Sequence, residues 1–386
     1  MNPGRILTTH AGSLPRPRSL TELHVQRFRG EAVDEAAFAA AVDAAVADVV
    51  ARQAEAGIDV ANDGEAPRES FFTFVRERLS GFGGHSQRPM MADMTRYPGF
   101  LEILGKMYPA GDSVSLIAPP QAIGPVANRG TSQVEAEARR LTDAARRLGS
   151  PFAATFLTSP SPGIVAAAMQ NAHYESIEAY VDAVADALAP EYRAILAGGH
   201  LLQIDAPDLA MERHTLFAGK PLSDFLDFVR HVVSAIDRAL GEAPRDRVRL
   251  HVCWGNYEGP HDLDVPLQDI WPEIAKLRAG AFLISMANPR HAHEVRCFEA
   301  GALPAEATLV AGVIDTTTNY VEHPEVVADR IVAAAGAVGD PARVMAGTDC
   351  GFETSAGFQS VAADVCWVKL KSLSDGARIA TRRLFG

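Results

Sequence analysis

Residues 176–205 read SIEAYVDAVADALAPEYRAILAGGHLLQID and contain the repeating unit from which we predict the fold. Ser176–Ala197 is a helical pattern, two glycines follow it, and Leu201–Ile204 is an apolar run short enough for a buried strand. A helix followed by a buried strand is typical of βαβ units, in which helices cover a parallel sheet. This stretch therefore predicts an α/β protein with a parallel sheet.

The same alternation extends in both directions along the chain. Further helical patterns cover Asp34–Glu55, Val134–Arg147, Leu222–Leu240, Leu267–Ala279 and Pro324–Ala335, of which the first ends at Gly57 and the last at Gly336. The other apolar runs are Ile58–Ala61, Val114–Ala118, Phe152–Leu157, Val248–Val252, Phe282–Met286, Thr308–Ile314 and Arg343–Ala346. Together with Leu201–Ile204 they make eight, the strand number of a (β/α)8 TIM barrel.

A doubly wound sheet is the alternative architecture. It would need a glycine-rich phosphate loop after the first strand, and residues 59–68, DVANDGEAPR, contain no GxGxxG pattern. The chain has 386 residues, whereas a barrel of this kind typically has about 250. We assign the excess to an N-terminal arm, residues 1–33, and to an insertion at the barrel mouth, residues 81–112. Residues 1–386 then form a single catalytic domain.

Composition and charge narrow the class of protein. The net charge of −12 argues against a nucleic-acid binder. We find no run of 18 apolar residues and no apolar core of a signal peptide, so we expect neither a membrane span nor secretion. Four cysteines are too few for a disulfide scaffold in a chain of this length, which indicates reduced thiols or metal ligands. We expect a cytoplasmic enzyme.

Polar residues follow several of the predicted strands, where TIM barrels place their active sites. They occur at Asn62–Glu65, at Asp205, at His251 with Cys253, at Asp315–Asn319 and at Asp349–Cys350. Acids, a histidine and two cysteines therefore converge on one face of the predicted barrel. A single acid after a strand can instead be a helix N-cap, and this alternative stays open for Asp63, Asp205 and Asp315.

The sequence His251-Val252-Cys253 suggests a metal site. Strand residues two apart point to the same side, so both side chains can reach one ion. Imidazole and thiolate together suit zinc, and Cys350 at the end of a later strand would give three ligands with an open fourth position. The alternative for a buried cysteine is that of a small apolar side chain, which we prefer for Cys297 and Cys366.

The set of motifs resembles the C-terminal catalytic barrel of the cobalamin-independent methionine synthases, a fold shared with uroporphyrinogen decarboxylase-like enzymes. The matching stretches occur in the family's order along nearly the whole chain. They are Thr8–Pro15 (TTHAGSLP), Asp63–Glu65 with Arg68, Leu202–Asp205 (LQID), His251–Cys253 (HVC) and Asp349–Gly351 (DCG).

The resemblance implies a Zn²⁺ site formed by His251, Cys253 and Cys350. In this family the substrate thiol binds zinc as a thiolate and attacks an alkyl carbon, because the metal lowers the thiol pKa. By the same resemblance Glu65 and Asp205 would bind the amino group of an amino-acid thiol such as homocysteine, and Gly12 with Ser13 its carboxylate. The alternative for Glu65 is a surface salt bridge with Arg68.

The chain departs from the family pattern at two positions. The family has a glutamate zinc ligand on a strand between the HxC strand and the final cysteine, but residues 283–290, LISMANPR, contain no carboxylate. Glu294 could take that place only if its loop folded back. Where the family has a histidine that protonates the departing folate, after a motif aspartate, this chain has Thr317 after Asp315. A hydroxyl is a much weaker general acid than imidazole near pH 7.

Two further segments resemble a short branch of the family that includes epoxyalkane:coenzyme M transferase (2-hydroxypropyl-coenzyme M lyase). They are residues 251–261, HVCWGNYEGPH, and residues 287–294, ANPRHAHE. His261, His291 and His293 are candidates for protonating a leaving oxygen or, with Arg290, for binding an acidic group. The alternative is that these histidines line a polar loop. Our predicted catalytic residues are Asp315, Thr317 and His291.

We therefore predict a zinc-dependent thiol S-methyl- or alkyltransferase that resembles 5-methyltetrahydropteroyltriglutamate–homocysteine S-methyltransferase. Its partners would be a small-molecule thiol and an alkyl donor, with no nucleic acid and no membrane, and a homo-oligomer is compatible with the sequence. One alternative is epoxide opening by coenzyme M. A uroporphyrinogen decarboxylase-like lyase, which would use Arg16, Arg18 and Arg68 to bind carboxylates, and a non-catalytic zinc or corrinoid partner protein rank lower.

Overall fold

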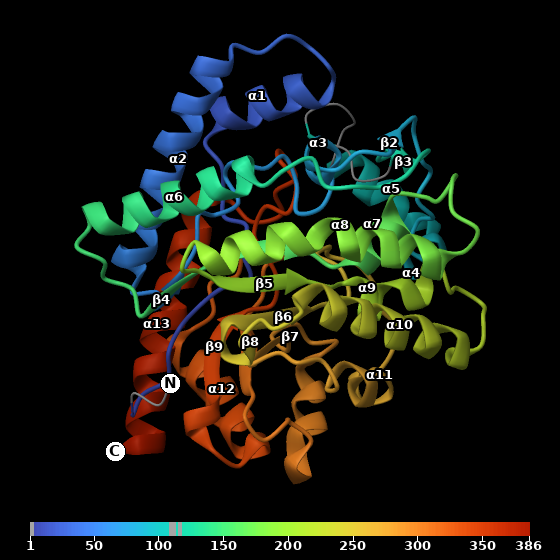
Figure 1. Cartoon of the computed structure of the whole chain (residues 1–386). Coiled ribbons are helices and arrows are strands. Elements are labelled where there is room, and N and C mark those ends of the chain that lie inside the picture. Colours follow the sequence, from blue (N-terminus) through green and yellow to red (C-terminus); the bar gives the residue numbers. More distant parts are fainter. Residues whose placement is uncertain (1–3, 108–112, 115–117) are drawn as a thin grey trace.

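The computed structural model describes residues 4–107, 113–114 and 118–386, and its centre is a curled parallel sheet of seven strands (Figure 1). All neighbouring strands in the sheet pair in parallel. In sheet order, which is also chain order, the strands are β1 (Val60–Ala61), β4 (Ala154–Pro160), β5 (Leu201–Asp205), β6 (Val248–Val252), β7 (Ala281–Ser285), β8 (Thr308–Ile314) and β9 (Val344–Thr348). Seven of the eight predicted strands are therefore confirmed.

The eighth predicted strand, Val114–Ala118, is not confirmed. Residues 115–117 lie outside the described part of the chain, and Val114 and Ala118 belong to no strand. The nearest strand is β3 (Gln121–Ala122), which pairs antiparallel with β2 (Phe82–Gly83) in a separate two-stranded sheet. The alternating pattern of apolar runs did not distinguish a short antiparallel pair from a strand of the main sheet.

The two edges of the parallel sheet both contact the N-terminal segment at residues 7–9. The backbone N–H of Thr9 donates to Ala346 of β9, and Ala346 donates back to Leu7, both at 2.9 Å. On the other side, Val60 of β1 donates to the carbonyl of Thr8 at 3.0 Å. The segment thus lies between the first and last strands and links them through backbone hydrogen bonds.

Helices cover the outer face of the sheet, and α8, α12 and α13 pack directly on its strands (Figure 1). The helices are α1 (Arg18–Phe28), α2 (Glu35–Ala56), α3 (Val75–Arg78), α4 (Ala92–Thr95), α5 (Pro98–Met107), α6 (Ser132–Arg147), α7 (Pro162–Ala168), α8 (Ile177–Ala197), α9 (Asp208–Met211), α10 (Leu222–Leu240), α11 (Leu267–Ile274), α12 (Pro324–Val338) and α13 (Ala363–Phe385). Short 3-10 helices are η1 (Glu212–His214), η2 (Arg245–Arg247), η3 (Ala292–Gly301) and η4 (Pro341–Arg343).

Helix ends follow local chemistry, with two corrections to the predicted bounds. The Asp34 carboxylate caps α2 by accepting from the backbone N–H groups of Ala36 and Ala37, and Gly57 ends α2 at φ 79°. Helix α12 was predicted to stop at Gly336 but continues to Val338 and ends at Gly339, because only Gly339 has the left-handed φ of 77°. Helix α11 ends at Ile274, five residues before the predicted end.

The two faces of the sheet bury different side chains. Leu250 and Val252 of β6 belong to the large apolar core that the helices complete, whereas Arg249 points to the opposite, inner face. The Arg249 guanidinium is buried there and donates to Gln203 Oε1 at 2.7 Å and Thr9 Oγ1 at 3.0 Å. A partly polar inner face of this kind can position chemistry at the carboxyl ends of the strands. Among the described residues, no helix has both the length and the apolar character needed to cross a bilayer.

Candidate active site

The predicted metal ligands come together at the carboxyl ends of β6 and β9. His251 lies on β6, Cys253 follows that strand and Cys350 follows β9, and all three are buried. One ligand atom from each lies within 4.8 Å of the other two, and the two Sγ atoms are 4.0 Å apart. Two thiolates bound to one tetrahedral zinc at about 2.3 Å would be separated by about 3.8 Å. Spacing and donor chemistry therefore both fit a zinc ion.

The electrostatics of this cluster also favour a cation. The Cys350 thiol and His251 hold the pKa of Cys253 well below its usual range. Burial opposes a charge on His251, but the Cys253 thiolate and Asp205, whose Oδ1 lies 3.0 Å from Nδ1, raise the pKa of His251 to about 10. Without metal the site thus favours an imidazolium beside a thiolate. A metal ion would take the place of the proton.

No carboxylate supplies a fourth ligand among the described residues around this triad. Ser285, which ends β7, donates its hydroxyl to the carbonyl of Asp349 at 2.6 Å. Glu294 does not fold back toward the triad; its Oε1 accepts from the backbone N–H of Leu267 at 3.1 Å and so caps the start of α11. The predicted departure from the family pattern is therefore a real feature of this structure. The triad offers three protein ligands.

A pair of acids, Glu65 and Asp205, belongs to the same group of strand ends. Glu65 Oε1 accepts from Thr158 Oγ1 at 2.9 Å, while Glu65 Oε2 is buried and has no hydrogen-bond partner. Burial and the nearby charge of Asp205 raise the pKa of Glu65 to about 7. An unpaired carboxylate oxygen beside a second carboxylate suits a cationic ligand such as an ammonium group.

The two alternatives considered for these acids are wrong. Arg68 forms its ion pair with Glu137 at 2.9 Å, and both are buried, so Glu65 is not the surface partner of Arg68. Asp205 is not an N-cap either: the N-cap of α9 is Pro207, and no side chain caps that end. Both acids instead lie buried at the strand ends.

Close backbone approach explains the glycines next to these residues. A Cβ on Gly12 would lie 2.4 Å from Glu65 Oε1, and one on Gly351 would lie 2.0 Å from Ser13 Oγ. Gly12 also has φ 142°, which side-chain-bearing residues rarely adopt. The structure therefore brings Gly12, Ser13 and Glu65 together, as predicted, and packs them against the loop that carries Cys350.

The loop after β8 holds the other two predicted catalytic residues, Asp315 and Thr317. Asp315 Oδ1 accepts from both the backbone N–H and the hydroxyl of Thr317, each at 2.8 Å. The Thr316 hydroxyl donates to Asn256, whose amide donates in turn to the carbonyl of Gly351 at 2.9 Å. The loop is thus fastened beside the loops that carry Cys253 and Cys350, and Asn256, which sequence reasoning missed, is the connecting residue.

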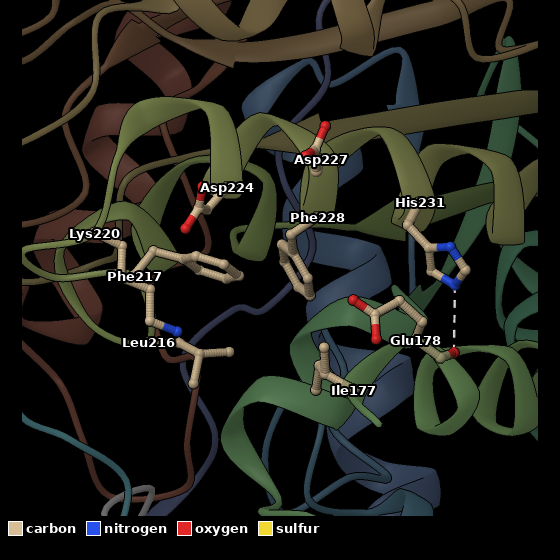
Figure 2. Close-up of a pocket in the computed structure, with 9 residues that line it drawn as sticks. All are labelled: Ile177, Glu178, Leu216, Phe217, Lys220, Asp224, Asp227, Phe228 and His231. Atoms are coloured by element: carbon tan, nitrogen blue, oxygen red, sulfur yellow. Dashed lines mark hydrogen bonds between the residues drawn. The ribbon is translucent and has the colours of Figure 1, made fainter. Parts of the chain in front are cut away.

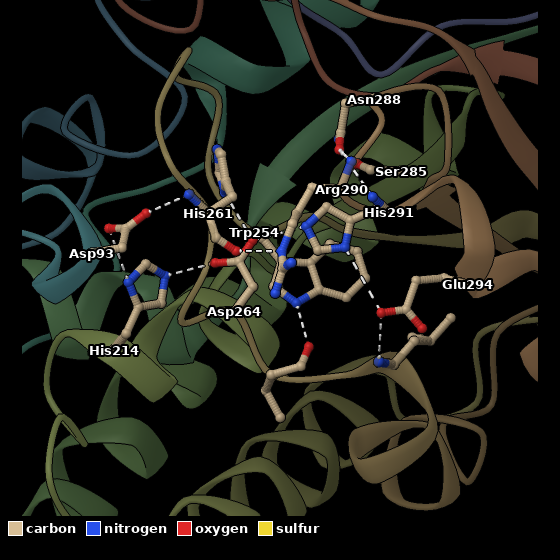
Figure 3. Close-up of polar contacts among 12 residues, drawn as sticks. Asp93, His214, Trp254, His261, Asp264, Ser285, Asn288, Arg290, His291 and Glu294 are labelled. Atoms are coloured by element: carbon tan, nitrogen blue, oxygen red, sulfur yellow. Dashed lines mark hydrogen bonds and ion pairs between the residues drawn. The ribbon is translucent and has the colours of Figure 1, made fainter. Parts of the chain in front are cut away.

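His291 lies in a second polar cluster rather than in the triad (Figure 3). It is buried, stacks on Trp254 with ring centroids 3.9 Å apart, and places Nε2 2.8 Å from Asp264 Oδ2. His261 contacts the same carboxylate oxygen at 2.7 Å, whereas the side chain of His293 is 63% exposed. Sequence reasoning missed Asp264; its one signal was an acid three residues after His261.

A surface groove lies elsewhere. Its volume is about 510 Å³, and it opens between the start of α8, residues 216–220 and α10 (Figure 2). The residues that line it are Ile177, Glu178, Leu216, Phe217, Lys220, Asp224, Asp227, Phe228 and His231. None of the predicted site residues is among them, so the groove carries no argument about catalysis.

The sequence matches a known protein family over most of its length. The family model "Cobalamin-independent synthase, Catalytic domain" matches residues 6–123 and 134–368. The chain belongs to this family. It is 23% identical over 384 residues to the methionine synthase of Saccharolobus solfataricus and 25% identical over 380 residues to that of Thermococcus kodakarensis. These alignments cover 98% of this chain and 95% and 94% of the relatives.

Solved structures show the same fold as this cobalamin-independent synthase domain. The B12-independent methionine synthase from Shewanella sp. W3-18-1, in complex with selenomethionine, has a TM-score of 0.73 at 21% identity over 98% of this chain and 99% of its own. The putative vitamin-B12 independent methionine synthase from Listeria monocytogenes has a TM-score of 0.64 at 18% identity, covering 97% and 98% of the two chains. The parallel α/β architecture is therefore common to this family.

Proposed function

We propose that the chain is a zinc-dependent S-methyltransferase that methylates the thiol of a homocysteine-like amino acid. The observation that carries this proposal is the convergence of a Cys–Cys–His triad at zinc-compatible spacing with the Glu65–Asp205 pair. Family membership and the curated methionine synthases support a transferase. The identity of the metal as zinc and of the substrate as a homocysteine-like thiol are what this proposal adds.

In this proposal His251, Cys253 and Cys350 hold the zinc, and the open fourth position receives the substrate sulfur. The metal would supply a thiolate nucleophile at neutral pH. Glu65 and Asp205 bind the substrate ammonium, because Glu65 Oε2 is buried without a partner. The backbone at Gly12 and Ser13 is placed to bind the substrate carboxylate next to Glu65.

We assign Asp315 and Thr317 to the side of the site that receives the methyl donor. The Thr317 hydroxyl donates a hydrogen bond to Asp315 Oδ1, so these two residues order the loop on that side of the site. His291 as proton donor stays a prediction, since its ring lies against Asp264, Glu294 and Trp254. We further propose one catalytic domain over residues 1–386, in which residues 7–9 complete an eight-stranded barrel.

The alternatives find less support in the site. Coenzyme M carries a sulfonate and would need cations near the zinc, whereas the acids Glu65 and Asp205 are there. A decarboxylase would need free arginines, but Arg16 donates to the carbonyls of Glu65 and Glu353, and Arg68 is paired with Glu137. Arg18 is exposed and paired with Glu22.

A paired assay tests the proposal. Protein purified with zinc would be incubated with homocysteine and methylated folate, and separately with coenzyme M and a small epoxide, and the products identified by mass. We expect methionine from the first mixture only. A thioether from the second mixture, or activity unchanged after complete removal of metal by a chelator, would overturn the proposal.

A further inference from the structure

A second cluster of metal-ligating side chains surrounds Asp264, outside the Cys–Cys–His triad (Figure 3). Asp264 Oδ2 lies 2.7 Å from His261 Nδ1 and 2.8 Å from His291 Nε2. These three atoms are all within 4.8 Å of one another. The exposed fractions of the side chains are 12% for His261, 3% for His291 and 2% for Asp264, so the cluster is enclosed by protein.

The hydrogen bonds of His261 determine which of its ring nitrogens carries a proton and which presents a lone pair to the Asp264 carboxylate. His261 Nε2 lies 3.0 Å from the backbone carbonyl of Tyr257, which can only accept, so Nε2 carries the proton. In a neutral ring Nδ1 is then an acceptor that faces another acceptor, Asp264 Oδ2. A buried contact of this kind requires either a second proton or a metal ion.

The two histidine rings are also held in place from outside the cluster. His291 stacks on Trp254 and His261 on Tyr257, with ring centroids 3.9 Å and 4.1 Å apart. His261 has φ 53°, an unusual backbone conformation that turns its ring onto Asp264. His291 Nδ1 is buried without a hydrogen-bond partner and lies 3.8 Å from Glu294 Oε1 (Figure 3). Both rings are thus held next to Asp264.

His214 braces the second oxygen of Asp264. Its Nε2 is 3.0 Å from Asp264 Oδ1, and its Nδ1 is 3.3 Å from Asp93 Oδ1. His214 thus contacts one carboxylate oxygen of Asp264 and leaves Oδ2 for the other two histidines.

We propose that His261 Nδ1, His291 Nε2 and Asp264 Oδ2 form a second metal site, which binds a divalent transition-metal ion such as Zn²⁺. Metal-bound histidines usually donate their other ring N–H to a carbonyl or carboxylate, as His261 does to Tyr257. Two imidazoles and one carboxylate suit zinc and its neighbours in the first transition row rather than Ca²⁺ or Mg²⁺. Water can supply the remaining ligands, since His261 is partly exposed.

The proposed site joins the loop that carries Cys253 to the loop after β7. His261 and Asp264 lie in the loop after β6, which begins at Cys253, and His291 lies in the loop after β7. Arg290 adds a contact between the same loops by donating from Nε to the carbonyl of His261 at 2.8 Å. An ion here would fix Trp254, the residue directly after Cys253, through its stacking on His291.

Metal content measured by mass spectrometry on zinc-loaded, gel-filtered protein tests this proposal. We expect about two zinc ions per chain in the unaltered protein and about one in a Cys253→Ser, Cys350→Ser double variant, because that variant keeps the second site intact. A His261→Ala, His291→Ala double variant should also bind about one. His293→Ala, an exposed histidine in the same loop, is the matched control and should bind about two.

The result that overturns the proposal is a Cys253→Ser, Cys350→Ser protein that is folded by circular dichroism and binds no zinc. Protons alone would then occupy the Asp264 cluster. If the histidine double variant fails to fold, the cysteine double variant decides the question by itself. Failure of the triad as a zinc site gives a different result, in which the cysteine double variant binds as much zinc as the unaltered protein.

Discussion

The four cysteines differ in their surroundings, and this difference predicts their chemistry. Cys253 and Cys350 face each other across 4.0 Å beside His251, whereas Cys366 is buried in the apolar core on α13. Burial raises the pKa of Cys366 well above its usual range, which keeps it a neutral thiol. Cys297 is half-buried and packs against the same core.

Cys350→Ser should abolish methyl transfer and lower zinc affinity by at least about 100-fold, because it removes one of three proposed protein ligands. Activity and metal content together measure this. Cys366→Ser is the matched control: it makes the same chemical change in the core, so it should cost about 1–3 kcal/mol of stability and leave zinc content unchanged. Equal zinc loss in both variants would contradict the assignment.

Glu65→Gln tests the ammonium site. A charged hydrogen bond contributes about 1.5–3 kcal/mol, so we expect the KM for homocysteine to rise about 10- to 100-fold. The pKa of Glu65 is about 7, so the unaltered carboxyl loses its charge as the pH falls below 7 and KM should rise there. The glutamine variant does not titrate and should lack this rise. Kinetics from pH 6 to 8 would show it.

Exposed Glu258 supplies the control for that experiment, since Glu258→Gln removes an equal charge from a solvent-exposed side chain. Its KM should stay within about twofold of the original value, because exposed charges contribute little. A comparable KM rise in both variants would mean that net charge, and not the contact to Glu65, governs binding.

At the scale of elements, close packing of α12 on α13 depends on Gly376. A Cβ at Gly376 would lie 2.5 Å from Val327 Cβ and 2.9 Å from the carbonyl of Pro324. Gly376→Ala should therefore lower the free energy of unfolding by about 1–3 kcal/mol. Gly336, inside α12, has nothing within 4 Å of its Cβ position, so Gly336→Ala should raise stability by up to about 1 kcal/mol.

Urea unfolding of both alanine variants measures the opposed effects. The two changes are chemically identical and both lie inside helices, so helix propensity favours alanine in each. A stabilised Gly376→Ala protein would show that α12 and α13 can move apart freely. That result would contradict the close approach of these helices.

At the scale of the molecule, Asp59 fastens the N-terminal segment to the first strand. Its Oδ2 accepts from the backbone N–H of Thr8 at 2.9 Å, and the carboxylate also pairs with the half-exposed Arg5. Asp59→Ala leaves the Thr8 N–H without its acceptor and should cost about 1–3 kcal/mol of stability. Arg5→Ala removes only the exposed pair and should cost less than about 1 kcal/mol.

Chemical denaturation of the two proteins, followed by tryptophan fluorescence, would separate these effects. We expect a lower midpoint with an unchanged slope for Asp59→Ala, as for a stability change that keeps two-state unfolding. Equal midpoints for the two variants would mean that the segment at residues 7–9 is held by its backbone bonds to β9 and β1 alone.

Sequence patterns predicted the regular elements where local preference and tertiary packing agree. Helix α10 and strands β6 and β8 have the predicted bounds. Helix α13 was missed, although its buried residues Cys366, Leu370, Leu373, Ala377 and Ala380 recur at spacings of three and four. Serines and a glycine inside the helix weaken its local preference, and packing against α2 and α12 stabilises it.

Some residues of the candidate site could be predicted from the sequence, and others could not. The HxC motif and the acids after the strands were visible in the sequence, because parallel strands place their carboxyl ends at one edge. The partners of Asp264 were not visible, because His214 and His291 come from different loops. Asp93, which contacts His214, lies in the region read as an insertion. No local spacing relates these residues.

The sequence by itself determined the family, the strand ends that carry the ligands and the absence of the family's glutamate between the HxC strand and Cys350. Only the tertiary structure decided that Glu294 caps α11, that Arg68 belongs to Glu137 and that Asp264 gathers three histidines. The reason is physical. Strand and helix patterns follow from neighbours along the chain, whereas the partner of a buried charge depends on which loops the closed sheet brings together.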